Sequence, residues 1–314
     1  MGASYTRYRI INYSRLVQKK LKRFSLKKVK RYAGKPLLPA EDGNAIIKAA
    51  LLSGEPFAAV RYGSSELATT IDAIEIDRGK RAEVRDKCMI SLCRNAGFFP
   101  NDKALAYKYG KQQLELAQQA DLFAVWGMNM EDYVIAVHGD KEAQICFPRG
   151  FEPYYFDEPW TAALAGKKVL VIHPFEKSIR RQYAKRELLF ENPDVLPAFE
   201  LKTLKAVQSA AFCETPFETW FDALNYMYEE AMKIDFDVAI LGCGAYGLSL
   251  ACMLKKAGKM AIHMGGATQI LFGIKGNRWD DHPVISKLYN EHWTRPLEEE
   301  TPKQANAVEG ACYW

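Results

Sequence analysis

The first 40 residues contain no aspartate and no glutamate, although the whole chain has 38 acidic residues. Twelve of the 43 basic residues lie in this segment, so the rest of the chain carries a net charge of −7. The total charge of +5 therefore combines a basic arm with an acidic body. Since no aromatic-rich RNA motif or zinc-finger spacing accompanies the basic charge, we expect no nucleic-acid partner.

Long apolar runs and paired cysteines are also missing. No run reaches the roughly 18 to 20 residues that a membrane-spanning helix needs. The seven cysteines are odd in number and offer no two pairs at zinc-binding spacing, which favours a reducing, cytoplasmic location. The sequence has no HExxH, GxSxG or Walker A pattern, which excludes the simplest zinc-protease, serine-hydrolase and P-loop interpretations.

The basic arm has a helical pattern. Within residues 7–31, apolar side chains recur every three or four positions, and lysines and arginines fill the other positions. This spacing predicts a basic amphipathic helix, which could lie on an anionic membrane or pack on the body as a solvated helix. The apolar positions are Ile10, Tyr13, Val17, Leu21 and Phe24.

The stretch "GKPLLPA" that follows indicates a linker. We therefore expect an arm and linker over residues 1–40 and one domain over residues 41–314. In that domain, short apolar runs bounded by turn residues alternate with helical segments, which predicts an α/β fold with a Rossmann-like, mostly parallel sheet flanked by helices. The polar, then aromatic, end of the chain indicates a tail that docks back onto the body. The predicted strands lie in "PFAAVRYG", "DLFAVWG", "KKVLVIHPF", "DFDVAILGCG" and "KMAIHMGG".

The stretch "DVAILGCGAYGLSLA" places Gly242, Gly244 and Gly247 between a predicted strand and a predicted helix. A helix that begins after such a loop offers free N–H groups to an anion, so we infer a phosphate or nucleotide site. NAD binding would need an acidic residue after the next strand, but none occurs between Asp237 and Asp280. A purely structural turn and an NAD- or S-adenosylmethionine-dependent enzyme are the alternatives.

Three further segments carry candidate site residues. In "VRYGSSEL", Arg61 could bind phosphate and Glu66 could act as a base or metal ligand, unless Ser64 or Ser65 merely caps a helix. The other segments are a basic helix start, which a solvated surface also explains, and a glycine-bearing loop that is either a lid or an ordinary turn. The basic segment contributes His173, Lys177, Ser178, Arg180 and Arg181, and the loop contributes Lys275, Arg278, Asp280 and Asp281.

In combination these segments resemble the GT-D type of bacterial glycosyltransferase, over most of residues 41–314. The resemblance implies a domain that transfers a sugar from a nucleoside diphosphate sugar to an acceptor hydroxyl in surface polysaccharide or glycan synthesis. It carries over Arg61, Gly63, Glu66 and Gly244. The resemblance rests on "FAAVRYGSSEL", "KVLVIHPFEKSI", "FDVAILGCGAYGLSLA", "GGATQILFGIKGNRW" and "EGACYW".

The resemblance also implies a metal site, since relatives carry Asp-x-Glu where this chain has Ser64-Ser65-Glu66. Glu66 would be a ligand of Mn²⁺ or Mg²⁺ or the catalytic base, with Asp280 as the alternative base. The relatives also carry a histidine and an aspartate in the segment where this chain has Gly266 and Thr268. In a metal-free site, Lys177, Arg181 or Lys275 would offset the diphosphate charge.

The expected partners are the nucleotide-sugar donor and a glycan or lipid-linked acceptor. The basic arm would hold a cytoplasmic enzyme at the inner face of the membrane. A catalytically silent module that binds a nucleotide or a partner protein remains an alternative.

Overall fold

Nine strands form one sheet through the middle of the protein. The computed structural model describes residues 2–22 and 25–314, and within them the strand order is β1-β2-β5-β4-β3-β9-β8-β6-β7. All paired neighbours are parallel except β1 and β2, so the expected α/β class with a mostly parallel sheet is confirmed. The strands are β1 (Arg31–Tyr32), β2 (Lys35–Leu38), β3 (Phe57–Arg61), β4 (Leu122–Ala124), β5 (Gln144–Cys146), β6 (Lys168–His173), β7 (Glu200–Lys205), β8 (Val238–Leu241) and β9 (Met260–His263).

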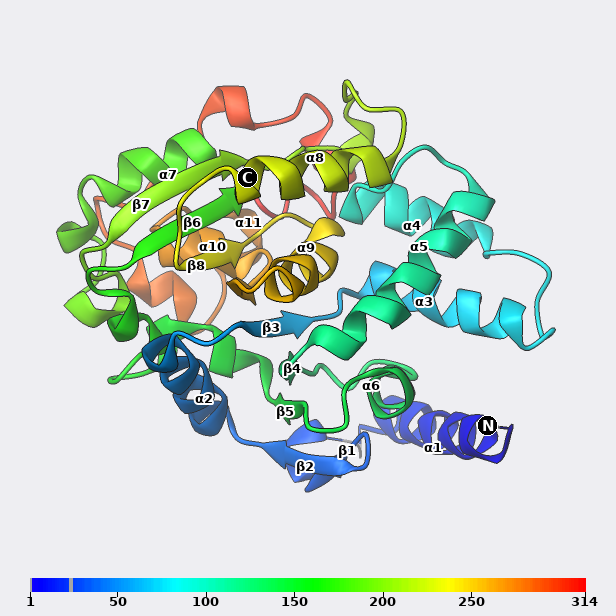
Figure 1. Ribbon diagram of the computed structural model, residues 1–314. Helices are drawn as coiled ribbons and strands as arrows, with labels where there is room; N and C mark the ends of the chain where they lie inside the picture. The colour runs from blue at the N-terminus through cyan, green and yellow to red at the C-terminus, as the bar shows by residue number, and fades with distance from the viewer. Residues whose placement is uncertain (1, 23–24) are drawn as a thin grey trace.

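Helices cover both faces of the sheet (Figure 1). Successive side chains of a strand point to opposite faces, so Ala239 and Leu241 of β8 join one core while Val238 and Ile240 join the other. The first core includes residues of α1, α3, α4, α5, α6, α8 and α9, and the second includes residues of α2, α7, α10 and α11. The helices are α1 (Gly2–Lys20), α2 (Ala40–Ser53), α3 (Ser64–Asp77), α4 (Asp86–Ala96), α5 (Lys103–Leu116), α6 (Glu131–His138), α7 (Glu176–Tyr183), α8 (Trp220–Met232), α9 (Tyr246–Lys256), α10 (Ala267–Leu271) and α11 (Asn277–Asp280).

Strands β3 and β9 lie side by side, and the chain leaves them toward opposite faces of the sheet. After β3 it enters α3 in the first layer, and after β9 it enters α10 in the second. Two loops that diverge in this way leave a crevice at the carboxyl ends of the strands. The topology therefore places a binding site between the loops that follow β3 and β9.

The N-terminal segment differs from its expected form. The helix spans Gly2–Lys20 instead of residues 7–31, and a 3₁₀ turn follows at Leu26–Lys28. Arg23 and Phe24, which the sequence pattern also assigned to the helix, lie outside the described residues. The expected linker is strand β2, because Leu37 and Leu38 pair in parallel with Ile145 and Cys146 of β5. Proline is tolerated in this strand because the amide that bonds toward β1 is that of Leu37, and Pro36 precedes the residues that pair with β5.

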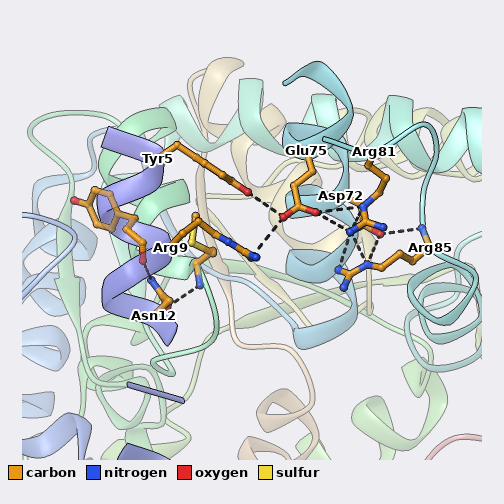
Figure 2. Close-up of polar contacts among 9 residues, drawn as sticks. Tyr5, Arg9, Asn12, Asp72, Glu75, Arg81 and Arg85 are labelled. Atoms are coloured by element: carbon orange, nitrogen blue, oxygen red, sulfur yellow. Dashed lines mark hydrogen bonds and ion pairs between the residues drawn. The ribbon is translucent and has the colours of Figure 1, made fainter. Parts of the chain in front are cut away.

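Helix α1 packs on the body beside α6 (Figure 1). Figure 2 shows side chains of α1 reaching a cluster of charged residues on and near α3. The hydroxyl of Tyr5 donates to Glu75 over 2.9 Å, and Arg9 lies 3.5 Å from the same carboxylate. None of the helices that the structure describes combines the length and the apolar character that crossing a membrane requires.

Candidate functional site

A cavity of about 480 Å³ opens at the carboxyl ends of the central strands. Its wall is built from the loops after β3, β4, β6, β8 and β9, together with the end of α4 and the last residues of the chain. This position matches the crevice that the sheet topology creates. The wall includes Arg61, Gly63, Ser64, Glu66, Trp126, Met128, His173, Gly242, Cys243, Gly244, His263, Gly265, Arg278, Glu309, Tyr313 and Trp314.

The loop after β8 presents backbone amides to this cavity. Gly244 has a φ of +56°, which a residue with a side chain rarely adopts, and this turn starts α9. Within the described part of the chain, the amides of Cys243 and Gly244 have no hydrogen-bond partner. Both residues line the cavity, so the loop offers two adjacent donors of the kind that hold phosphate oxygens.

The other two glycines of the pattern have different neighbours. A Cβ at Gly242 would lie 2.4 Å from the Cδ2 atom of His173. A Cβ at Gly247 would lie 2.0 Å from the Cε1 atom of His263, and Gly247 is not part of the cavity wall. The three glycines therefore make room for two histidines and a tight turn, and Gly242 and Gly244 reach the cavity.

Arg61 ends β3 and extends over the loop after β9. A Cβ at Gly265 would lie 1.7 Å from its Nη2 atom, so the guanidinium covers the bare backbone of that glycine. The Nε atom of Arg61 is buried and has no hydrogen-bond partner among the described residues. A buried donor without a partner costs about 1 to 3 kcal/mol, so this side chain is suited to bind an anion in the cavity.

Glu66 lies in the first turn of α3, and its carboxylate folds back over Gly63. A Cβ at Gly63 would lie 2.2 Å from Oε2 of Glu66, so a bare backbone is needed here too. Burial raises the pKa of Glu66, while its own backbone amide and the charge of Arg61 oppose that rise. A carboxylate whose pKa is raised is a stronger base than an ordinary glutamate.

The two serines before Glu66 do not cap α3. The residue before the helix is Gly63, and no side chain accepts a capping hydrogen bond there. Ser64 is exposed at the cavity, while Ser65 is buried and its hydroxyl lies 2.7 Å from the hydroxyl of Ser91 on α4. The interpretation of this segment as a simple serine cap is therefore wrong.

His173 and His263 stand in the wall at the ends of β6 and β9, and both are neutral. Burial lowers the pKa of each imidazole to about 3, and the charge of Arg61 adds to the effect at His263. Nδ1 of His173 accepts a hydrogen bond from the amide of Phe175 over 3.0 Å, so the neutral ring carries its proton on Nε2. His173 can therefore donate a hydrogen bond but brings no positive charge to a diphosphate.

The cations expected at the start of α7 lie outside the cavity wall. The amides of Lys177 and Ser178 donate to the buried carboxylate of Glu300, which occupies the anion position of this helix terminus. The ammonium of Lys177 lies 3.0 Å from Glu299, and Arg181 is exposed. The structure thus brings His173 to the cavity but not the basic residues that follow it.

In the loop after α10, too, only some of the candidate residues line the cavity. Asp280 forms an ion pair with Arg295 at 2.6 Å, and the ammonium of Lys275 lies 5.1 Å from the ring centre of Tyr289. Neither residue lines the cavity, whereas Arg278 from the same loop does. Arg278 is ion-paired with Glu309 and stacks on Tyr313, so this cation is already compensated within the wall.

The rim formed by Trp126 and Met128 is fixed by a buried carboxylate. Glu131 accepts hydrogen bonds from the amides of residues 126–128, at 3.1, 2.8 and 3.1 Å, and from the hydroxyl of Tyr32 at 3.0 Å. Burial raises the pKa of Glu131 to about 7, against these hydrogen bonds. The ring centre of Trp126 lies 5.8 Å from the guanidinium carbon of Arg61, so this rim and Arg61 lie on the same side of the cavity.

The acidic residues of the cavity wall do not fit a metal ion held by protein groups alone. In the part of the chain that the structure describes, Glu66 and Glu309 supply the acidic side chains of the wall, and Glu309 is engaged by Arg278. Among the described residues, no three histidine, cysteine or acidic side chains lie close enough together to hold a metal. Arg61 and the backbone amides are therefore the groups of the wall that can offset negative charge on a ligand.

Sequence reasoning identified part of this wall. The predicted site residues that line the cavity are Arg61, Gly63, Ser64, Glu66, Gly242 and Gly244, together with the candidates His173 and Arg278. Sequence reasoning overlooked His263, although a histidine at the end of an apolar strand, opposite a glycine-rich loop, was a usable signal. Trp126 was also missed, because a single tryptophan after a strand carries no pattern.

No family model matches the chain, and no curated protein matches it. Two solved structures are similar in fold, and both contain the domain of unknown function 1792; one of them is described as having a distinct glycosyltransferase fold. Each shares 13% sequence identity with this chain, covers 85% of it and is itself covered over 93% of its length, with a TM-score of 0.48. At this identity and TM-score, the likeness assigns neither a family nor an activity to the chain.

Proposed function

We propose that this protein is a glycosyltransferase that moves a sugar from a nucleoside diphosphate sugar to an acceptor hydroxyl in bacterial surface polysaccharide or glycan synthesis. The observation that carries the proposal is the group of unpaired donors in one cavity: the Nε–H of Arg61 and the amides of Cys243 and Gly244. A diphosphate has enough oxygens to accept from the guanidinium and from backbone amides, and the topological switch between β3 and β9 is where open α/β sheets bind nucleotides.

The reaction assigns a distinct role to each group. The acceptor oxygen attacks the anomeric carbon of the donor, and the bond from that carbon to the diphosphate oxygen breaks, so the leaving nucleoside diphosphate takes the electron pair. Arg61 and the two amides stabilise the charge that develops on it. Glu66 takes the proton of the acceptor hydroxyl, which its raised pKa favours. His173 is neutral and can donate a hydrogen bond from Nε2 without adding charge.

The end of β9 supports a nucleotide sugar over NAD. The strand ends at His263, and Met264 and Gly265 follow before α10. A dinucleotide site of the Rossmann type would place an acidic side chain here to bind the ribose hydroxyls. Arg61 lies over Gly265 instead, which suits a ligand that brings negative charge to this point.

The test is a thermal-shift panel on the wild-type chain and an Arg61→Gln variant. The ligands are UDP, GDP, CMP, UDP-sugars, NAD and S-adenosylmethionine, each with and without Mn²⁺. A ligand at about 100 times its Kd stabilises the native state by about 2.7 kcal/mol. We expect this stabilisation from a nucleoside diphosphate or its sugar, and we expect Arg61→Gln to lose it.

Arg181→Gln is the matched control, since it removes an arginine that is exposed and lies outside the cavity wall. Equal stabilisation in both variants, or stabilisation by NAD or S-adenosylmethionine alone, would contradict the proposal. Release of the free nucleoside diphosphate in the presence of an acceptor then separates a transferase from a silent nucleotide-binding module.

A further inference from the structure

Helix α1 is held on the body by polar contacts. The amide nitrogen of the Asn12 side chain donates to the buried carboxylate of Asp132 over 2.8 Å, and the hydroxyl of Tyr5 donates to Glu75. At the other end of the helix, the ammonium of Lys19 donates to the carbonyl of Gly127 over 2.7 Å. The helix therefore has a fixed rotation about its axis, and Figure 2 shows Tyr5 and Arg9 turned toward Glu75.

The opposite face of α1 and its extension is apolar and open to solvent. The exposed fractions are 65% for Ile10, 70% for Tyr13, 40% for Val17 and 57% for Leu21. These positions are three or four residues apart, so they form one continuous stripe. The side of α1 that faces the body already buries apolar groups, since the rings of Tyr5 and Tyr8 pack on Tyr133. The stripe is therefore a second apolar face, at the place where an ordinary surface helix is polar. A row of this kind marks a contact surface, whereas single exposed apolar side chains do not.

Basic residues surround the stripe. Arg7, Lys20 and Lys22 are exposed on the helix and just beyond it, and Lys27 and Lys28 are exposed in the following turn. Residues 1–40 contain no acidic side chain to balance them. We propose that α1 is an interfacial helix that docks this protein on an anionic lipid bilayer, with the stripe in the acyl boundary and the basic residues at the headgroups. A second copy of the chain fits this stripe less well, because the basic residues beside the two stripes would repel one another.

Docking through α1 would bring the lipid bilayer close to the rim of the cavity. Gly127, which accepts the hydrogen bond of Lys19, lies between Trp126 and Met128 of the cavity rim. The side chain of Leu26 also reaches Gly127, since a Cβ there would lie 3.2 Å from its Cδ1. An acceptor carried on a lipid would therefore meet the cavity from the docked side; this point alone depends on the proposed transferase activity, while the docking does not.

The experiment is cosedimentation of the full chain with vesicles of phosphatidylcholine alone or of phosphatidylcholine with a quarter of phosphatidylglycerol. The test variant is Ile10→Ser/Val17→Ser/Leu21→Ser, which keeps every basic residue. The matched control is Leu52→Ser/Leu188→Ser, since these leucines are 69% and 50% exposed and lie elsewhere on the surface. We expect the wild type and the control to bind the anionic vesicles, with the affinity of the test variant reduced roughly tenfold or more and that of the wild type falling as salt rises.

Equal binding by the test variant and the control would overturn the proposal, as would binding that does not depend on phosphatidylglycerol. Sedimentation velocity supplies a further contrary outcome: if the wild type is a dimer and the test variant a monomer, the stripe binds a second copy. Because the substituted side chains are exposed, the variants should keep the melting temperature and the nucleotide response of the wild type. Loss of vesicle binding with an unchanged nucleotide response distinguishes this proposal from that of the transferase.

Discussion

The guanidinium of Arg61 lies on the backbone of Gly265, so close that a Cβ at this glycine would stand 1.7 Å from Nη2. The two residues come from the ends of the adjacent strands β3 and β9, 204 positions apart in the chain. The glycine therefore sets the place of the guanidinium that we assign to diphosphate binding. Its own φ of +62° also requires glycine.

Gly265→Ala should displace Arg61 and weaken nucleotide binding. The substitution also forces a residue with a side chain into the left-handed region, which costs about 1 to 2 kcal/mol of stability. Gly258→Ala is the control, because Gly258 has a φ of +81° but open space around its Cβ position. We expect a similar backbone penalty in both variants and loss of the nucleotide-dependent thermal shift only in Gly265→Ala; an unchanged shift there would show that Arg61 does not contact the ligand.

Glu66→Gln should remove the proposed base while leaving donor binding intact. Loss of a general base typically lowers kcat by about 10² to 10⁴. Burial raises the pKa of Glu66, so this carboxylate becomes protonated at a higher pH than an ordinary glutamate. The wild-type rate should therefore begin to fall at that higher pH as the solution is acidified. Initial rates across pH give both results. A variant with full activity, or one that no longer binds the donor, would assign Glu66 another role.

Gly247→Ala should destabilise the fold by crowding His263 of the cavity wall. The added Cβ would overlap the imidazole of His263, and overpacking of this kind costs about 1 to 3 kcal/mol. In a double-mutant cycle with His263→Ala, removal of the ring should cancel most of that cost, as coupled neighbours do. Free energies of unfolding from urea titrations give the coupling. Additive effects would mean that the crowding lies elsewhere.

Acid should release α1 before the body unfolds. Burial of Glu75 would raise its pKa, but the hydrogen bonds from Arg81 and Tyr5 outweigh it and the pKa is lowered from 4.5. A carboxylate whose pKa is lower in the folded state stabilises it above pH 4.5, and this contribution is lost as the pH falls through the lowered value. The protection of the α1 amides against hydrogen exchange, relative to the intrinsic rate at each pH, should fall in that range, and Glu75→Gln should show the lower protection already at pH 7. Exchange in α1 that follows global unfolding at every pH would contradict this.

The sequence predicted the central strands because both of their faces are buried. The runs around residues 168–173, 238–241 and 260–263 are continuously apolar, which is typical of parallel strands between two helical layers. Strand β7, with the sequence ELKTLK, was not predicted, because it lies at an edge and its side chains are half-buried or exposed. Strand β2 contains a proline and was taken for a linker; its pairing with β5, about 100 residues later, is not visible in local composition.

The site could be predicted where the backbone alone places residues together. Arg61, Glu66 and Gly244 follow parallel strands, and the carboxyl ends of such strands meet at one edge of a sheet. The predictions for Lys177 and Asp280 depended on which groups neutralise them, namely Glu299 and Arg295, and no local pattern identifies those partners. The same limit applies to α1, whose periodicity located the apolar stripe but not the buried Asn12 and Asp132 that turn it outward.

Each glycine of the Gly-x-Gly-x-x-Gly pattern has its own neighbour: the ring of His173, the carbonyl of Ala96 and the ring of His263. The spacing is thus required by two side chains on the flanking strands and one backbone carbonyl of α4 before any ligand is considered. A useful search for other proteins with this cavity would pair the glycine pattern with a histidine at the end of each flanking strand, and would drop the acidic residue that dinucleotide fingerprints demand.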